Sequence, residues 1–354
     1  MVGSNCWPGP RFTPNPRASG DPARMRLLIV SDAWHPQLNG VVRAIENLAT
    51  ELTALGDAVE VIGPDRFRNF PMPGYAEIRL AFRPRAALRG MLDQARPDAI
   101  HIATEGPLGM AARAICAERG WRFTTSFHTR FAEYVTARTG IPPRLTWALL
   151  RRFHNAGAGT FAATPMLREE LARRGFRQVL PWSGGVNLSL FQEGERDEWA
   201  ALPRPVFLYV GRVAVEKNIA AFLKLDLPGS KVVVGDGPQR AALQARYPDV
   251  HFAGWREGDG LVRAYRGGDV MVFPSRTDTF GLVLVEAMAC GTPVAAFPVM
   301  GPRDVVGGGG VLDEDLRRAC LAALDVPRAA ARIQAERFSW PASASAFRSH
   351  LVTI

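Results

Sequence analysis

Short apolar runs alternate with segments of helical periodicity along almost the whole chain. Within the first such segment, Val41, Ile45, Leu48, Leu52 and Leu55 recur at spacings of three and four residues, which predicts a helix over 41–55. The runs that predict buried strands are 27–30, 58–62, 99–102, 123–127, 159–163 and 179–182 in the first half, and 206–210, 231–234, 251–253, 270–273 and 294–297 in the second. Strand–helix alternation of this kind predicts an α/β protein whose parallel sheets are joined by right-handed crossovers.

The length of 354 residues suits two domains better than one core. We expect a first domain over 25–184, a second over 185–335, and a last helix over 336–354. Residues 1–24 are rich in Pro, Gly and Arg and contain no apolar core. They predict a disordered tail, or sequence upstream of a true start at Met25, and do not resemble a secretory signal.

Composition narrows the class of protein further. Hydrophobic residues make up 47% of the chain and charged residues 22%, which is typical of a globular protein, and no apolar run is long enough to span a bilayer. Cys6, Cys116, Cys290 and Cys320 match no metal or disulfide spacing, so we expect a reducing cytoplasm. The net charge of +9 indicates an anionic partner or a genome rich in arginine codons. No nucleic-acid-binding motif accompanies this charge, so we expect no nucleic-acid partner.

Two carboxylates follow the apolar run 270–273, with Asp278 on the predicted loop and Glu286 eight residues later in a helix over 282–290. Such a loop offers backbone N–H groups to a phosphate where the helix begins. The two acids can accept hydrogen bonds from hydroxyl-rich groups on either side of a diphosphate, as in a nucleotide sugar. The alternative is an ordinary strand–loop–helix unit with a solvated Asp.

Arg212 and Lys217 follow the run 206–210 and are preceded by Gly211. Both cations can reach one diphosphate, the first as a planar fork and the second as a point charge. Cations near a helix start oppose the helix dipole, which favours an anion between them over a purely structural role. Gly235 lies in a Gly-Asp-Gly-Pro turn after the next predicted strand.

The first half carries two weaker signals. Gly40 precedes the first predicted helix, where a phosphate could approach the backbone, although Asn39 as an ordinary N-cap explains the same residues. His128 follows the run 123–127, where its imidazole could hydrogen-bond a sugar hydroxyl, although a lone His is more often structural.

The order of these motifs resembles retaining GT-B glycosyltransferases of glycosyltransferase family 4 (group 1), including bacterial enzymes that transfer mannosyl, glucosyl, glucuronosyl or sulfoquinovosyl groups to lipids. Asp278 stands where the first Glu of the family's E-x7-E signature usually is. The resemblance implies two Rossmann-like domains facing each other across a cleft, with the acceptor on the first and the nucleotide sugar on the second. It also implies that the last helix, over 336–354, crosses back to the first domain.

The resemblance also implies residue roles. Asp278 would bind hydroxyls of the transferred sugar, Glu286 the ribose, and either Trp255 or Arg256 the nucleobase. The catalytic set would be His128, Arg212, Lys217 and Asp278, and the remaining donor-binding residues Gly40, Gly211, Gly235, Thr279, Phe280, Gly281 and Leu282. The donor would be a UDP- or GDP-sugar, with neither a metal ion nor another cofactor, and its diphosphate would take the acceptor's proton.

Three positions depart from the family pattern. Asp278 shortens the reach of the first acid by one methylene, and Gly184 and Asn187 stand where close relatives often carry Arg and Asp. The last two changes either compensate each other or weaken acceptor contacts. Two alternatives therefore stay open: a nucleotide-sugar epimerase of GT-B fold, and a degenerate nucleotide-sugar-binding scaffold.

Basic residues are interleaved with Trp, Leu and Phe at helical spacing over 143–154, and Arg83, Arg85 and Arg89 form a second basic group. Such a helix can lie on an anionic membrane, or it can pack inside the domain with solvated arginines. Together with the resemblance, this favours a lipid acceptor such as diacylglycerol or a glycolipid. It also favours a peripheral location on the inner face of the plasma membrane.

Overall fold

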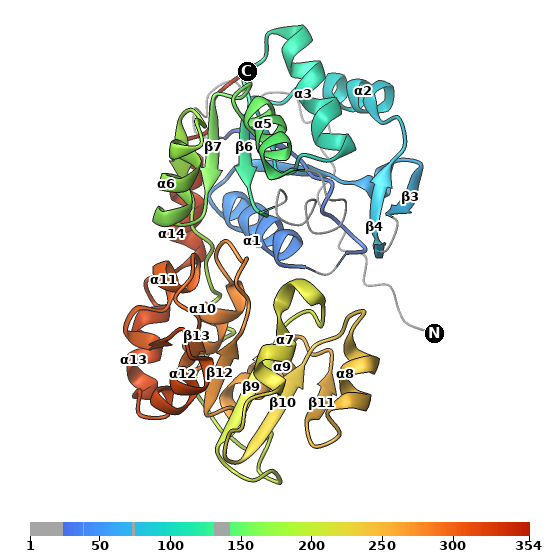
Figure 1. Ribbon diagram of the computed structural model, residues 1–354. Coiled ribbons are helices and arrows are strands. Elements are labelled where there is room, and N and C mark those ends of the chain that lie inside the picture. Colours follow the sequence, from blue (N-terminus) through green and yellow to red (C-terminus); the bar gives the residue numbers. More distant parts are fainter. Residues whose placement is uncertain (1–23, 38, 73–74, 131–141) are drawn as a thin grey trace. The chain divides into compact units, whose positions relative to one another are not determined.

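The structure is a computed structural model that describes residues 24–37, 39–72, 75–130 and 142–354 (Figure 1). The predicted tail over 1–24 lies almost entirely outside the described residues. The chain forms two compact units. Unit 1 contains the residues up to Ala163, Arg168–Trp182 and Ala344–Ile354, and unit 2 contains Thr164–Leu167 and Ser183–Ser343.

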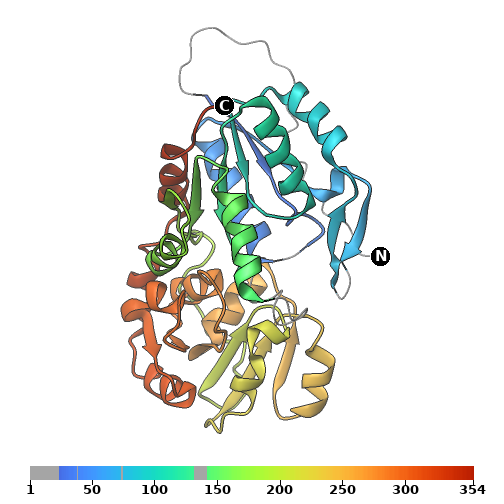
Figure 2. The same cartoon turned by 45° about the horizontal axis from the view of Figure 1, so that its top comes forward.

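Unit 1 is built on a six-stranded parallel sheet, which agrees with the predicted α/β class. Its order is β2 (Ala58–Ile62), β1 (Arg26–Val30), β5 (Ala99–Ile102), β6 (Thr124–Phe127), β7 (Gly159–Ala162) and β8 (Val179–Pro181). Because the chain moves in one direction from β5 to β7, α3 (Pro107–Arg119) and α5 (Pro143–His154) share one face of the sheet. Figure 2 shows these two helices side by side, with α1 (Gly40–Ala54) behind the sheet.

Two elements of unit 1 differ from the sequence prediction. An antiparallel hairpin of β3 (Asn69–Met72) and β4 (Tyr75–Ala81) precedes α2 (Arg85–Ala95) and was not predicted, because a proline interrupts β3 and leaves no apolar run. The buried face of α1 includes Val42, Ile45, Leu48 and Leu52. The predicted face is wrong at its end, since Leu55 follows the helix and is 45% exposed.

Unit 2 has a second six-stranded parallel sheet. Its order is β11 (His251–Gly254), β10 (Ser230–Val234), β9 (Val206–Val210), β12 (Val270–Phe273), β13 (Val294–Ala296) and β14 (Gly310–Leu312), the last too short to be predicted. Along the chain this is the 3-2-1-4-5-6 order of dinucleotide-binding folds. The order reverses between β9 and β12, and ligands bind such sheets at the carboxyl ends of the strands beside the reversal.

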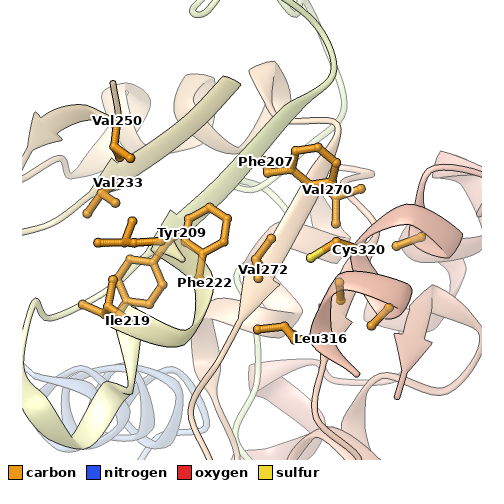
Figure 3. Packing of buried hydrophobic residues seen from close by; sticks show 14 of the residues in the cluster. Phe207, Tyr209, Ile219, Phe222, Val233, Val250, Val270, Val272, Leu316 and Cys320 are labelled. Atoms are coloured by element: carbon orange, nitrogen blue, oxygen red, sulfur yellow. The ribbon is translucent and has the colours of Figure 1, made fainter. Parts of the chain in front are cut away.

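Helices cover both faces of this sheet. They are α7 (Ile219–Leu223), α8 (Arg240–Arg246), α9 (Gly258–Gly267), α10 (Leu282–Ala289), α11 (Pro302–Val305), α12 (Leu316–Ala323) and α13 (Arg328–Ala335). In Figure 3, side chains of the central strands pack against Ile219 and Phe222 of α7 and against Leu316 and Cys320 of α12. This buried cluster holds the sheet in place beneath the loops at its carboxyl end.

The final helix, α14 (Trp340–Ser349), begins in unit 2 and ends in unit 1. Within unit 1, the Phe347 ring stacks on Phe161 with centroids 4.4 Å apart, and Arg348 Nε lies 2.7 Å from Asp57 Oδ2. Across the described ranges, no helix is both long and apolar enough to cross a bilayer.

Candidate active site

The loops after β9 and β12 lie side by side at the strand-order reversal of unit 2. Asn218 Nδ2 donates to the main-chain oxygen of Pro274 over 3.0 Å, and Thr277 Oγ1 donates to that of Glu216 over 3.4 Å. Asn218 itself has a φ of +52°, in the left-handed region that Asn tolerates, and leads directly into α7. The fold therefore brings the predicted basic loop against the predicted acidic loop.

Lys217 and Asp278, two of the predicted catalytic residues, form an ion pair. Lys217 Nζ lies 2.5 Å from Asp278 Oδ1, and the two side chains are 25% and 18% exposed. The second oxygen, Asp278 Oδ2, is buried and has no hydrogen-bond partner among the described residues. A buried acceptor oxygen beside a cation suits the binding of a hydroxyl group, because an unsatisfied buried oxygen is costly.

Arg212 occupies the same loop, next to Glu216. Its Nη1 lies 3.9 Å from Glu216 Oε1, and its main-chain oxygen accepts a 2.8 Å hydrogen bond from the hydroxyl of Tyr209. Each predicted phosphate-binding cation thus has a carboxylate nearby, and the four charges sum to zero. A diphosphate bound by the two cations would compete with these carboxylates.

Gly281, predicted to bind phosphate, lies at the start of α10. Gly281 is the N-cap with a φ of +86°, and no side chain caps the helix, so the first N–H groups of α10 are not satisfied by a cap. Phe280, just before it, is buried and packs edge-on against Phe338 with centroids 5.6 Å apart. The helix ends at Ala289, one residue before the predicted end.

Glu286 lies just over one turn into α10 and is buried. The hydroxyl of Tyr265, on α9, donates to Glu286 Oε2 over 2.9 Å. Sequence reasoning missed Tyr265, because the contact joins residues 21 positions apart on two helices that are separated by β12. The bond orients the buried carboxylate of Glu286.

The glycine turn after β10 has a packing role that its sequence only hinted at. A Cβ atom on Gly235, whose φ is +142°, would lie 1.9 Å from the main-chain oxygen of Gly211. The amide of Val213 also donates to the main-chain oxygen of Asp236 over 2.8 Å. Gly235 therefore allows the β10 loop to touch the loop that carries Arg212.

At the end of β11, Trp255 is 43% exposed, as a residue that stacks on a nucleobase must be. Its neighbour Arg256 forms a 3.2 Å ion pair with Glu198. Of the two residues, Trp255 is thus the better placed for contact with a base.

In unit 1, Asn39 is the N-cap of α1, and its Oδ1 accepts from the amides of Val41 and Val42. A Cβ atom on Gly40 would meet no atom within 4 Å, so the protein packing itself does not require glycine there. Sequence reasoning missed Asp32 on the same loop. Its buried carboxylate accepts from the amides of Leu108 and Gly109 at the start of α3, which ties the loops after β1 and β5 together.

His128 is partly buried in unit 1, with its ring 5.3 Å from the Trp182 ring and edge-on to it. Burial, and to a lesser degree His154, lower the pKa of His128 to about 4. The imidazole is therefore neutral at neutral pH and can both donate and accept a hydrogen bond. His154 itself bonds Thr125 and Glu105, a structural arrangement that the sequence did not reveal.

The departures from the family pattern at Gly184 and Asn187 have local explanations. A Cβ atom on Gly184 would lie 2.7 Å from Phe280 Cε1, so a larger side chain there would have to displace this ring. Asn187 Oδ1 accepts from the amides of Ser189 and Leu190, and so closes a turn. Neither residue behaves as the remnant of an Arg–Asp pair.

One Asp-x-Asp sequence, Asp313-Glu314-Asp315, escaped the sequence reasoning. Asp315 caps α12, and Asp313 Oδ2 pairs with Arg318. In the part of the chain that the structure describes, no group of three or more His, Cys, Asp or Glu residues could hold a metal ion.

Helix α5 has the bounds predicted for the basic amphipathic helix, and both of its faces are informative. Trp147, Leu150 and Phe153 are buried, and the Arg174 guanidinium lies 3.9 Å above the Trp147 ring. Leu145 and Leu149 are 57% and 58% exposed on the other face, and Arg144, Ala148, Arg151 and Arg152 are also exposed. The helix therefore packs into unit 1 and also presents an apolar and basic surface, here called the α5 face.

Comparisons with known proteins agree with this organisation. A family model described as Glycosyltransferase Family 4 matches residues 38–190, and one described as Glycosyl transferases group 1 matches residues 204–333. The chain is 32% identical over 310 residues to the GDP-mannose-dependent alpha-mannosyltransferase of Mycolicibacterium smegmatis, a match that covers 80% of this chain and 82% of that protein. It is 27% identical to the sulfoquinovosyl transferase SQD2 of Arabidopsis thaliana, over 82% of this chain and 63% of that protein.

Solved structures share the fold. Sucrose-phosphate synthase of Thermosynechococcus elongatus aligns over 92% of this chain and 98% of that one, with a TM-score of 0.74 and 22% identity. HepE of Anabaena, solved with UDP-glucose, aligns over the same shares with a TM-score of 0.67 and 17% identity. Two parallel-sheet α/β units that match these structures define a GT-B glycosyltransferase. The chain belongs to glycosyltransferase family 4, as the motifs around Lys217 and Asp278 predicted.

Proposed function

We propose that the protein transfers a hexose from a UDP- or GDP-sugar to a lipid acceptor with retention at the anomeric carbon. The observation that carries this proposal is the arrangement at the strand-order reversal of unit 2. There Lys217 pairs with Asp278, three residues before the N-cap Gly281 of α10, and Arg212 lies on the same loop as Lys217. Relatives support the donor class, since one is named for GDP-mannose and a fold neighbour was solved with UDP-glucose.

In the proposed reaction, the bond between the anomeric carbon and the diphosphate breaks while the acceptor oxygen bonds to that carbon on the same face. The acceptor's proton passes to the departing diphosphate. Arg212, Lys217 and the N–H groups at Gly281 stabilise the charge that develops on this leaving group. Asp278 and Glu286 accept from sugar and ribose hydroxyls, and the neutral His128 hydrogen-bonds the transferred sugar. No metal ion is needed.

The lipid acceptor is supported by the α5 face and by relatives. The alpha-monoglucosyldiacylglycerol synthase of Streptococcus pneumoniae is 26% identical over 77% of this chain and 71% of that protein. Exposed leucines beside arginines suit an anionic bilayer, because the apolar groups enter the acyl region while the guanidinium groups bind lipid phosphates. We therefore place the enzyme at the inner face of the plasma membrane, bound peripherally.

Calorimetric titration with UDP, GDP and their hexose derivatives, without added metal, tests the donor site. We expect one nucleotide to bind, and Glu286→Gln to weaken it. Incubation of the matching sugar nucleotide with diacylglycerol or a glycolipid in anionic vesicles should give an α-linked product by NMR. Binding of neither nucleotide would contradict the proposal, and nucleotide binding without transfer or epimerisation would favour the scaffold alternative. Sugar epimerisation without transfer would favour the epimerase.

Sedimentation with vesicles containing phosphatidylglycerol tests the α5 face. We expect salt-sensitive binding that the double variant Leu145→Ser/Leu149→Ser reduces about tenfold or more, since two exposed leucines would leave the bilayer. Ile333→Ser is the matched control, because Ile333 is exposed on α13 of unit 2. Equal binding of wild type and the double variant would exclude this surface.

A further inference from the structure

One buried polar group directly below the basic loop has no role in the reaction as described so far. Tyr209 lies near the end of β9, with its ring among Ile219, Phe222 and Val233 in the core of unit 2 (Figure 3). Its hydroxyl is the polar atom of an otherwise apolar cluster, and it donates to the main-chain oxygen of Arg212 over 2.8 Å.

The surroundings of this hydroxyl are those of a fixed donor. Burial, and then the charges of Asp278 and Glu216, raise the pKa of Tyr209 well above its ordinary value. The phenol therefore stays protonated and keeps its hydrogen at any pH at which the protein works. Asp278 pairs with Lys217, and Glu216 lies next to Arg212, so Tyr209 is close to both of these charged pairs.

The backbone above Tyr209 has little freedom to compensate for its loss. A Cβ atom on Gly211 would lie 3.2 Å from the Tyr209 hydroxyl, so the turn wraps closely over it. The amide of Gly211 donates to the main-chain oxygen of Val234 over 3.0 Å. The hydrogen bond from the Tyr209 hydroxyl also fixes the main-chain carbonyl of Arg212, the residue whose guanidinium is proposed to bind the diphosphate.

We propose that Tyr209 is a positioning residue for Arg212: its hydroxyl holds the backbone of the β9 loop so that the guanidinium meets the donor diphosphate. The inference rests on the proposed function, since the nucleoside diphosphate is the ligand concerned. Tyr209 acts through Arg212 and does not touch the ligand. Tyr209 orients the β9 loop before the diphosphate binds. Without the hydroxyl the loop would be more flexible, and binding would weaken because the loop would have to be ordered when the diphosphate arrives.

The test is a double-mutant cycle in GDP and UDP affinity, measured by calorimetry on the full chain. Tyr209→Phe removes one oxygen and keeps the ring, and should raise the Kd for the nucleoside diphosphate by about five- to tenfold, the worth of one hydrogen bond. In an Arg212→Ala background it should add less than about twofold, because the group that it positions is gone. Tyr247→Phe is the control, since Tyr247 packs against the same core cluster.

A second measurement keeps the proposal testable if either variant loses stability. Amide hydrogen exchange in Tyr209→Phe should accelerate in peptides that cover 211–218 and stay unchanged in those that cover 282–289. An unchanged Kd in Tyr209→Phe, or an equal loss in both backgrounds, would overturn the proposal. If the wild type binds neither nucleotide, the proposed function fails instead, and exchange over 211–218 alone decides whether Tyr209 holds the loop.

Discussion

Because Lys217 and Asp278 form an ion pair, Asp278→Asn should have opposite effects on nucleotide binding and on sugar transfer. The substitution keeps the shape of the side chain and removes its charge. Asp278 neutralises Lys217 in the ion pair, so its loss leaves a full positive charge on Lys217 for the diphosphate. Nucleotide binding should therefore tighten while sugar transfer slows, because Asp278 is also the proposed ligand of the sugar.

The magnitude follows from the geometry. Two unit charges 2.5 Å apart attract by roughly 7 kcal/mol at an effective dielectric constant of about 20. Partial exposure, salt and the desolvation of both groups reduce the net value for such a pair to about 1–2 kcal/mol. Released to the diphosphate, this corresponds to an increase of about five- to thirtyfold in UDP or GDP affinity. Loss of a charged hydrogen-bond acceptor at the sugar should lower kcat by about tenfold or more.

Calorimetry at low and high salt, with initial rates of transfer, measures both effects. Lys217→Met should weaken nucleotide binding by a similar factor, and the gain in Asp278→Asn should shrink at high salt. Asp93→Asn is the control, because Asp93 forms a 2.7 Å ion pair with Arg119 in unit 1. Weaker nucleotide binding in Asp278→Asn would refute the reasoning and show that Asp278 holds Lys217 in position for the phosphate.

Three further predictions concern packing, pH and thiols. Gly235→Ala should lower the free energy of unfolding by about 3 kcal/mol or more and abolish nucleotide binding, because its Cβ would overlap the Gly211 oxygen at a positive φ. Gly308→Ala, where the Cβ would meet open space, should lower it by less than about 1 kcal/mol. Equal losses of the two variants in urea titrations would contradict this prediction. The pKa of about 4 for His128 lies below its unfolded value of about 6.5, so the unfolded chain binds the proton first. The free energy of unfolding should thus fall by about 3 kcal/mol as the pH drops from about 6.5 to about 4. In urea titrations, His128→Gln should make the free energy of unfolding less dependent on pH over this range. Burial raises the pKa of all three cysteines of the described chain to about 12, so a thiol reagent should label them only after unfolding; rapid labelling of the native protein would contradict their burial.

The sequence alone determined the class of fold and most of its elements. Strands of a parallel sheet are buried on both faces, so runs such as 206–210 and 270–273 are apolar throughout and stand out from the helices between them. The bounds of α5 and the start of α10 were predicted because periodicity and the preceding Pro or Gly mark them locally. The β3–β4 hairpin and β14 lack such local marks, and only the packing of the chain shows them.

The candidate site divides in the same way. Arg212, Lys217, Asp278 and Glu286 were identified from residue type and spacing, because a strand end followed by a helix start constrains what a loop can bind. Their pairing was not, since Lys217 and Asp278 are 61 positions apart.

The tertiary structure alone decided which residues support this set. Tyr265 reaches Glu286 across 21 positions, and Asp32 reaches Leu108 across 76. Hydrogen bonds between residues so far apart leave no periodicity in the sequence, because each depends on the order of the strands within the sheet. The sequence thus determined the chemistry available at the loops, and the strand order determined which of those groups meet.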